Sequence, residues 1–364
     1  MLLHIVFFVA GLVALVAGAS SLVRGASKLA LSVGISPLVV GLTVVAFGTS
    51  APEMAVTVGA VLEGQNDIAV GNVIGSNIFN VLFILGLSAL IVPLVVNSQL
   101  IRQEVPIMIG ASLLVLALGL DGAISWLEGG LLFGLLLGYT AFLVIQSRRA
   151  TKAESAEFDA ELQPAAASDW DGKLPVQIVL IVIGLVLLVL GSGWLVDSSI
   201  AFARAFGVSE LIIGLTIVAA GTSMPEVATS ITAAFKGERD IAVGNVVGSN
   251  TFNLLGVIGL GGMVSFGSAG LIFSEAVLAF DVWIMLAVAL ACLPVFISGR
   301  EIARWEGAVF VGYYVAYVTY LILAAQQHAA LHGFSMVMMG FVVPLTIVTL
   351  VVVLLRHKAP AKAD

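Results

Sequence analysis

The chain has 364 residues, of which 60% are hydrophobic and only 10% are charged, and its mean hydropathy is +1.15. Soluble domains carry about 25% charged residues, so this composition excludes an ordinary soluble fold. The formal net charge of −7 does not indicate a nucleic-acid partner, because the few basic residues stand at the edges of apolar segments. The lone Cys292 excludes an internal disulfide and a cysteine-based metal cluster.

Apolar runs of roughly 20 residues recur along the whole length, and each is long enough to cross a bilayer as a helix. Because backbone groups in lipid must bond internally, helices are the expected spanning structure, and we predict an all-α polytopic membrane protein. The first run lacks the basic start of a signal peptide, so we interpret it as a membrane helix. The eleven predicted spans are Leu2–Val23, Pro37–Leu62, Ile68–Val92, Val105–Leu120, Ile124–Ile145, Pro175–Ile200, Leu211–Phe235, Ile241–Val264, Val277–Phe296, Trp305–Leu323 and Phe334–Leu355.

The basic residues predict the orientation of these spans. With the N-terminus outside, the cytoplasmic loops contain 14 of the 15 Lys and Arg residues, and only Arg204 falls on the other side. The positive-inside rule therefore predicts an N-out, C-in topology. Residues 148–174 are expected to form a solvated cytoplasmic connector. The chain thus divides into a first half (1–147), this connector, a second half (175–326), and an extra span with a basic tail (327–364).

One segment occurs twice, at residues 41–87 and again at 214–260. The two copies are identical at 28 of 47 positions, without a gap, at a constant offset of 173 residues. Such self-similarity indicates one structural unit used twice. Five spans separate the starts of the copies, and this odd number makes them cross in opposite directions. The sequence therefore predicts two inverted five-helix repeats plus one extra C-terminal helix, an architecture typical of secondary transporters.

Each copy places one acid in an otherwise apolar segment. In GTSAPE, Pro52 lacks an amide hydrogen, so the carbonyl of Gly48 loses its helical partner and we expect a kink at mid-membrane depth. Thr49 and Ser50 precede Glu53 by four and three residues, which puts both hydroxyls near the carboxylate. The second copy, GTSMPE, repeats these residue types at Gly221, Thr222, Ser223, Pro225 and Glu226.

The next helix of each copy adds neutral oxygens. In GNVIGSNIFN, Ser76 and Asn80 are four residues apart and share one helical face. Their equivalents in GNVVGSNTFN are Ser249 and Asn253. Two glycines in each motif form a small-xxx-small face that lets helices approach closely, namely Gly71 with Gly75 and Gly244 with Gly248. We expect Asp67 and Asp240, just before these helices, to act as N-caps.

The pooled side chains are two carboxylates, hydroxyls and amides, without histidine or cysteine. Ca²⁺ binds such oxygen sets, whereas softer metals prefer sulfur or imidazole. An acid at the bilayer centre costs roughly 2.5–3.5 kcal/mol on insertion scales. A shared divalent cation would offset this cost and the repulsion between two facing acids. Two alternatives stay open: each Glu is protonated and hydrogen-bonded, or the Ser and Asn side chains only join helices.

The paired GTSxPE and GNxxGSNxFN blocks resemble the alpha-repeats of the calcium/cation antiporter superfamily, specifically the prokaryotic sodium/calcium exchangers, over about residues 17–326. The resemblance implies a central calcium position bridged by Glu53 and Glu226 and completed by the backbone carbonyls of Thr49 and Thr222. It implies flanking sodium positions that use Ala46, Ser50, Ser76, Ala219, Ser223 and Ser249, with Asn80 and Asn253 between them. It also implies that the first and sixth spans slide against the rest to alternate access.

One departure from the family pattern concerns charge. Some family members carry Asp where this chain has Asn253, and here Asn80 is also an amide. Two carboxylates balance one Ca²⁺ or two monovalent cations, so a third monovalent ion would rest on neutral oxygens.

We therefore expect a secondary antiporter that exchanges Ca²⁺ for Na⁺ in the plasma (inner) membrane of a prokaryote, without cofactors or enzymatic activity, and a monomer is expected to suffice for transport. Exchange of Ca²⁺ for protons is the alternative that the low acid count leaves open. An intramembrane hydrolase is disfavoured because its acid and base need dissimilar settings, whereas these acids have equivalent ones. A channel would conduct without a counter-ion.

Overall fold

The computed structural model describes the backbone of residues 2–158, 170–207, 213, 216–217 and 219–357, and the side chains of these residues except 150–158, 170, 219 and 353–357. Three predicted features therefore lie partly outside the described residues: the connector, the span over residues 211–235, and the basic tail.

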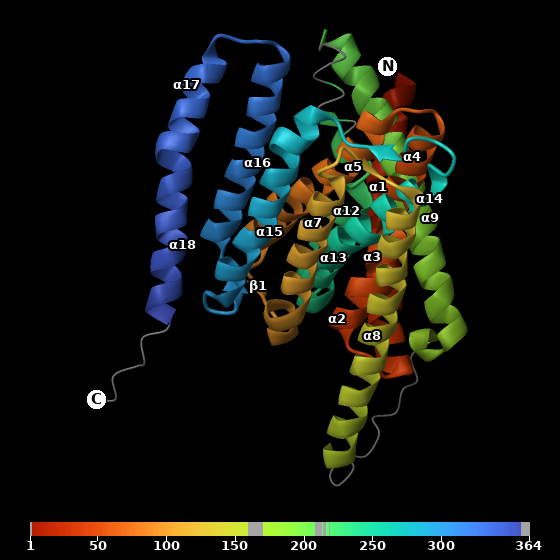
Figure 1. Ribbon diagram of the computed structural model, residues 1–364. Helices are drawn as coiled ribbons and strands as arrows, with labels where there is room; N and C mark the ends of the chain where they lie inside the picture. Colours follow the sequence, from red (N-terminus) through yellow and green to blue (C-terminus); the bar gives the residue numbers. More distant parts are fainter. Residues whose placement is uncertain (1, 159–169, 208–212, 214–215, 218, 358–364) are drawn as a thin grey trace.

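The first half consists of long helices that are interrupted by short π-helical turns (Figure 1). Its elements are α1 (Leu2–Val33), α2 (Pro37–Val40), η1 (Gly41–Val45), α3 (Ala46–Thr49), α4 (Ala51–Leu62), α5 (Asn66–Phe79), η2 (Asn80–Leu85), α6 (Gly86–Ile91), β1 (Leu94–Val95), η3 (Leu100–Glu104), α7 (Val105–Gly119), β2 (Ala123–Ile124) and α8 (Trp126–Phe158).

The second half follows the same plan, and one additional spanning helix, made of α17, η8 and α18, comes after it. Its elements are the 3₁₀ turn η4 (Trp170–Gly172), α9 (Leu174–Ala205), α11 (Ala219–Gly221), α12 (Met224–Phe235), α13 (Arg239–Phe252), η6 (Asn253–Val257), α14 (Ile258–Val264), β3 (Leu271–Ile272), η7 (Val277–Asp281), α15 (Val282–Ile297), β4 (Glu301–Ile302), α16 (Arg304–Ala325), α17 (Ala330–Val337), η8 (Met338–Val342) and α18 (Val343–His357). The π turns η2 and η6 begin at equivalent positions of the two copies, Asn80 and Asn253.

The described residues include nine helical segments that are long and apolar enough to span a membrane. A tenth candidate is the bent pair Pro37–Thr49 and Ala51–Leu62. The all-helical polytopic membrane fold is therefore confirmed. The count of eleven spans and their orientation stay predictions, because the span over residues 211–235 is only partly described.

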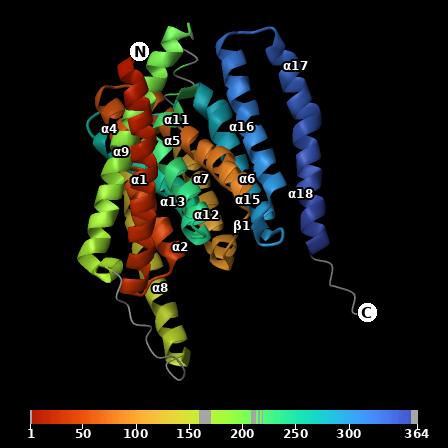
Figure 2. The ribbon, with the colours of Figure 1, turned by 180° about the vertical axis from the view of Figure 1, so that it is seen from behind.

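Helices α1 and α9 lie side by side (Figure 2), and their contacts indicate an approximate twofold axis between the two halves. A β carbon placed on Gly11 would lie 2.9 Å from the Gly191 carbonyl oxygen, and one on Gly18 would lie 2.8 Å from the Gly184 carbonyl oxygen. The contacts advance along α1 as they retreat along α9, so these helices are antiparallel. Gly11 and Gly184 are 173 residues apart, as are Gly18 and Gly191, so the contact maps onto itself.

Two short strand pairs also join the halves. Strand β1 pairs with β4, placing Leu94 opposite Ile302, and β2 pairs with β3, placing Ala123 opposite Ile272. Both pairs are antiparallel. Each pair takes one strand from each half, which is the exchange that a twofold axis requires.

The centre of the bundle is formed by α13 and its continuation. The apolar window of the span Arg239–Val264 is completely buried, whereas that of Ala330–Val352 is not buried at all. Accordingly, α17 and α18 lie at one edge beside α16 (Figure 1). A β carbon on Gly248 would lie 2.7 Å from the Leu42 Cα, which confirms close approach at this small-xxx-small face. The equivalent partners of Gly71 and Gly75 fall among residues 211–215, mostly outside the described residues.

Two helices continue beyond their predicted ends. The predicted first span ends at Val23, but α1 runs on to Val33, and α8 extends to Phe158, into the predicted connector. Both extensions consist mainly of good helix formers, including Ala, Lys, Leu and Glu, so polarity there does not stop the helix.

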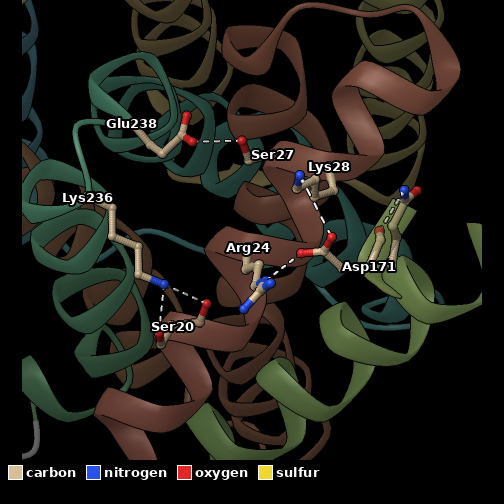
Figure 3. A network of polar contacts seen from close by, with 8 residues as sticks. Ser20, Arg24, Ser27, Lys28, Asp171, Lys236 and Glu238 are labelled. Atoms are coloured by element: carbon tan, nitrogen blue, oxygen red, sulfur yellow. Dashed lines mark hydrogen bonds and ion pairs between the residues drawn. The ribbon is translucent and has the colours of Figure 1, made fainter. Parts of the chain in front are cut away.

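The extension of α1 contacts two other segments that we assign to the cytoplasmic side (Figure 3). Arg24 Nε donates to Asp171 Oδ2 at 2.6 Å, and this bond holds the pKa of Asp171 below its ordinary value. Ser27 Oγ donates to Glu238 Oε1, in the loop between α12 and α13, at 2.7 Å. The Asp171 side chain is fully buried, so this end of the connector is docked, and the prediction of a wholly solvated connector is wrong there.

Candidate cation site

Both copies contain the predicted helix break. In the first copy α3 ends at Thr49, α4 begins at Ala51, and the helix bends by 44°. Ser50 lies between them with φ −80° and ψ 5°. In the second copy α11 ends at Gly221 and α12 begins at Met224. A proline occupies the first turn of α4 and of α12, where its missing amide hydrogen is tolerated, so the predicted break is confirmed.

The carbonyl freed by the second proline has a defined partner. Pro225 removes the helical donor for the Gly221 carbonyl oxygen, and Ser192 Oγ of α9 donates to that oxygen at 2.7 Å. The residue of α1 that lies 173 positions before Ser192 is Ala19, which has no hydroxyl. The two halves therefore differ in how they satisfy the break.

The two acids of the repeats are buried and reach across the twofold axis. Glu53 and Glu226 are both 0% exposed. Ser223 Oγ donates to Glu53 Oε1 at 2.9 Å, and Ser50 Oγ donates to Glu226 Oε1 at 3.3 Å. Each carboxylate thus accepts from the serine of the other copy, which brings the two broken helices together around the acids.

Side chains of α5 and η6 complete one side of this centre. Ser76 Oγ lies 3.0 Å from Ser223 Oγ and 3.5 Å from Glu53 Oε1. Asn253 Nδ2 donates to Ser76 Oγ at 3.2 Å. The predicted helical faces of both copies therefore meet at the acid of the first copy.

The equivalent residues on the other side are oriented by a neighbouring amide. Asn80 Nδ2 donates to Asn250 Oδ1 at 2.9 Å, and Asn250 Nδ2 donates to the Asn77 carbonyl oxygen at 3.2 Å. Since the amide nitrogen of Asn80 is used, its carbonyl oxygen is the atom left for another partner. Asn250 was absent from the sequence-based prediction.

Five buried side-chain oxygens of this centre have no hydrogen-bond partner within the part of the chain that the structure describes. They are Glu53 Oε2, Glu226 Oε2, Asn80 Oδ1, Asn253 Oδ1 and Ser249 Oγ. Burying an acceptor without a partner is unfavourable by about 1–3 kcal/mol. Carboxylate, amide and hydroxyl oxygens are the ligands of hard cations, so the set fits Ca²⁺ or Na⁺ as transported ions. Among the described residues, no three His, Cys, Asp or Glu side chains gather as an alternative metal site.

The threonines of the two motifs lie beside the acids, and each hydroxyl donates to an asparagine of the opposite copy. Thr49 Oγ1 donates to Asn245 Oδ1 at 3.1 Å, and Thr222 Oγ1 donates to Asn72 Oδ1 at 3.3 Å. These asparagines were missed as functional residues, although both are the first Asn of the repeated GNVxGSN motif at the 173-residue offset. Roles for the threonine carbonyls in ion binding stay predictions.

Two further predicted positions lie at the helix starts next to the breaks. Ala46 is the first residue of α3 and is buried. Ala219 is the first residue of α11, and its side chain lies outside the described residues.

The predicted N-caps need a correction. Asp67 and Asp240 are the second helical residues of α5 and α13, and the N-cap positions are Gln65 and Glu238. Negative charge in the first helical turn is favourable near the amide end of the helix dipole, which accounts for acids at these positions.

One buried acid outside the motifs was also missed. The helix of the fourth span begins at Leu100 with η3, five residues before the predicted start at Val105, and therefore includes Glu104. Glu104 is 0% exposed. Tyr139 Oη donates to Glu104 Oε2 at 2.5 Å. Two glutamine amides donate to the other carboxylate oxygen, those of Gln99 at 2.8 Å and Gln103 at 2.7 Å. With both oxygens occupied, this carboxylate joins η3 to α8.

Two inverted repeats whose broken helices bring buried acids together inside a membrane bundle define a secondary transporter of cations. Comparison with known proteins gives the same class. A model of the sodium/calcium exchanger protein family matches residues 3–145 and 176–323, and the chain belongs to this family. The chain is thus a calcium/cation antiporter of the membrane and not an enzyme.

Relatives of known name span most of the chain. The sodium/calcium exchanger MaX1 of Methanosarcina acetivorans is 32% identical over 307 residues, covering 76% of this chain and 87% of the relative. The inner membrane protein YrbG of Escherichia coli K12 is 40% identical over 224 residues, covering 62% of this chain and 68% of the relative. A solved structure of the sodium–calcium exchanger NCX_Mj, soaked with Na⁺ and Ca²⁺, superposes with a TM-score of 0.72 at 29% identity, covering 88% of this chain and 98% of that one.

Proposed function

We propose that the protein exchanges Ca²⁺ for Na⁺ by alternating access at one central site. The observation that carries this proposal is the reciprocal contact of the two acids. Glu53 and Glu226 are buried, each accepts from the other copy, and each keeps one oxygen without a partner. A cation between the halves supplies the partner that both oxygens lack. The sodium–calcium exchange named for MaX1 and NCX_Mj agrees with this cargo.

The charge of the site makes occupancy by the two ions mutually exclusive. Two carboxylates neutralise one Ca²⁺ or two Na⁺, and the amides of Asn80 and Asn253 add no charge. Binding Ca²⁺ and Na⁺ together would leave a net positive centre inside the bilayer, which is strongly unfavourable. We infer that one ion species leaves before the other binds, which is the condition for coupled exchange.

We further propose that α1 and α9 move as one body to alternate access. At five glycines of this crossing, Gly11, Gly18 and Gly25 on α1 and Gly184 and Gly191 on α9, an added β carbon would lie within 3.0 Å of the other helix's backbone. Two helices packed this closely are expected to move as one unit, because separating them would break the close backbone contacts.

Transport in proteoliposomes tests the proposal. Vesicles loaded with Na⁺ are diluted into Na⁺-free buffer, and uptake of ⁴⁵Ca²⁺ is followed in wild type, Glu53→Gln and Glu226→Gln. We expect uptake that depends on the outward Na⁺ gradient in wild type and is lost in both variants. Thr251→Ile is the matched control. Among the described residues, Thr251 Oγ1 bonds only to the Val247 carbonyl of its own helix, and the equivalent residue in the first copy is already Ile78. Uptake that ignores the Na⁺ gradient contradicts the proposal.

Exchange of Ca²⁺ for protons is the second candidate. The observation that favours it is the presence of only two carboxylates, since two protons neutralise them as well as two Na⁺ do. Uptake of ⁴⁵Ca²⁺ is measured with an imposed pH gradient in Na⁺-free buffer. If uptake is driven there and a Na⁺ gradient has no effect, protons are the coupling ion; no uptake under the pH gradient removes this candidate.

A further inference from the structure

Two asparagines connect the helix breaks across the twofold axis. On α5, Asn72 Oδ1 accepts from Thr222 Oγ1 at 3.3 Å, and Asn72 Nδ2 donates to the Glu53 carbonyl oxygen at 3.2 Å. The same amide nitrogen lies 3.1 Å from Thr57 Oγ1. One amide side chain thus contacts the backbone at the acid of the first copy and the threonine at the break of the second copy.

The contact recurs on the other side of the axis. On α13, Asn245 Oδ1 accepts from Thr49 Oγ1 at 3.1 Å, and its Nδ2 donates to Ser230 Oγ at 3.0 Å. Asn245 and Ser230 lie 173 residues after the Asn and Thr of the first copy that make the same pair. The same threonine–asparagine contact is therefore present in both copies of the repeat, which indicates a functional role.

Both threonines of this contact lie at the helix breaks. Thr49 ends α3, and Thr222 lies directly after α11, so both stand where the regular helical bonds stop. The direction of a carbonyl at such a break depends on backbone torsions that the helix no longer fixes. A side-chain bond to an asparagine of the opposite copy restricts those torsions. Asn245 is 0% exposed and belongs to the most deeply buried span, which makes it a fixed reference point.

We propose that Asn72 and Asn245 are positioning residues for ion binding: each holds the threonine of the opposite copy so that its backbone carbonyl faces the cation site. The inference rests on the proposed use of this centre for Ca²⁺, but not on whether Na⁺ or H⁺ is the coupling ion. Neither asparagine contacts the cation. Each acts through a hydroxyl–amide bond, so its loss lowers the affinity for Ca²⁺ more than the rate of turnover.

Substitutions at Thr222 test the hydroxyl–amide bond separately from ion binding by the Thr222 carbonyl, because every variant keeps the backbone carbonyl. Thr222→Val removes the hydroxyl with little change in shape, and Thr222→Ser retains it. One net hydrogen bond changes an equilibrium by about two- to tenfold. We expect Thr222→Val to raise the dissociation constant for ⁴⁵Ca²⁺ and the Ca²⁺ concentration at half-maximal transport by about fivefold, with maximal rate within about twofold of wild type. Thr222→Ser restores most of the lost affinity.

A double-mutant cycle identifies the partner. Asn72→Leu alone weakens Ca²⁺ binding at least as much as Thr222→Val, and adding Thr222→Val to it has no further effect. Two independent losses that multiply overturn the inference, since the two side chains then do not act through one bond. The mirrored pair Asn245→Leu and Thr49→Val gives the same pattern.

A purely structural role predicts a different result. If the bond only stabilises the fold, Thr222→Val lowers the midpoint of thermal unfolding in ion-free buffer but leaves the Ca²⁺ dissociation constant of the folded protein unchanged, and the inference fails. Equilibrium binding of ⁴⁵Ca²⁺ in Na⁺-free buffer is measured together with Glu53→Gln. Failure of wild type to bind Ca²⁺ refutes the proposed function itself. Binding that needs Glu53 but ignores Thr222→Val refutes only the inference.

Discussion

The hydrogen bond between α9 and the broken helix of the second copy makes the most specific stability prediction. Ser192 Oγ donates to the Gly221 carbonyl oxygen at 2.7 Å, and Pro225 has removed the helical donor that this oxygen would otherwise have. Ser192→Ala leaves a buried carbonyl without that partner. Such a loss costs about 1–3 kcal/mol in soluble proteins and nearer 0.6–1.7 kcal/mol between membrane helices. We expect Ser192→Ala to lower the free energy of unfolding by about 1 kcal/mol.

The chain offers a matched control on the same helix. Ser199 Oγ, two turns further along α9, donates at 2.7 Å to the Leu195 carbonyl of its own helix, which keeps its regular backbone donor. Ser199→Ala is therefore expected within about 0.5 kcal/mol of wild type. Unfolding by SDS in mixed micelles, followed by tryptophan fluorescence, measures both variants. Equal stability of Ser192→Ala and Ser199→Ala would refute the assigned role of the Gly221 carbonyl.

Three further predictions concern other contacts. Gly184→Ala brings a β carbon to 2.7 Å from the backbone of α1, so we expect a lower midpoint of thermal unfolding. Gly193→Ala on the same helix is the control, because nothing lies within 4 Å of its β carbon and the midpoint is expected to stay unchanged. Equal midpoints for the two variants contradict the close crossing of α1 and α9. Tyr139→Phe removes the donor to Glu104 Oε2 and lowers the free energy of unfolding by about 1–3 kcal/mol, and an unchanged value refutes that role. Because the pKa of Asp171 is lowered in the folded state, its contribution is present at neutral pH and is lost as the pH falls below about 4. Asp171→Asn should flatten that acid dependence of the thermal midpoint, and an identical pH profile contradicts it.

The helix breaks could be predicted from sequence because their cause is local. Pro52 and Pro225 remove backbone donors wherever the rest of the chain lies. The meeting of Glu53 with the second copy could also be predicted, since an inverted repeat that places one acid in each half brings both to the axis.

The partners at the site could not be predicted in the same way. The residues around Ser192 do not indicate that it bonds the Gly221 carbonyl. Its equivalent in the first half is Ala19, which has no hydroxyl, so comparing the two halves could not predict this bond either. Asn72 and Asn245 did carry a signal, since both are identical at the repeat offset. Their roles depend on contacts between residues about 150 and 196 positions apart, which only the packing of two halves creates.

Helix ends were the least predictable part of the fold. The first span was predicted to end at Val23, just before Arg24, but Arg24 binds Asp171 and the helix continues to Val33. The predicted fourth span starts just after Glu104, and the donors from Tyr139 and two glutamines allow this acid to be buried. In both cases the charged side chain has a hydrogen-bond partner that lies far away in the sequence.

The central claim is that Glu53 and Glu226, one from each half, hold the same Ca²⁺. Equilibrium binding of ⁴⁵Ca²⁺ to the purified protein in Na⁺-free buffer tests it most directly, with Glu53→Gln, Glu226→Gln and the Thr251→Ile control measured side by side. The account predicts that either single Glu substitution abolishes binding while the control binds as wild type does. Retention of wild-type affinity by either Glu variant would contradict it.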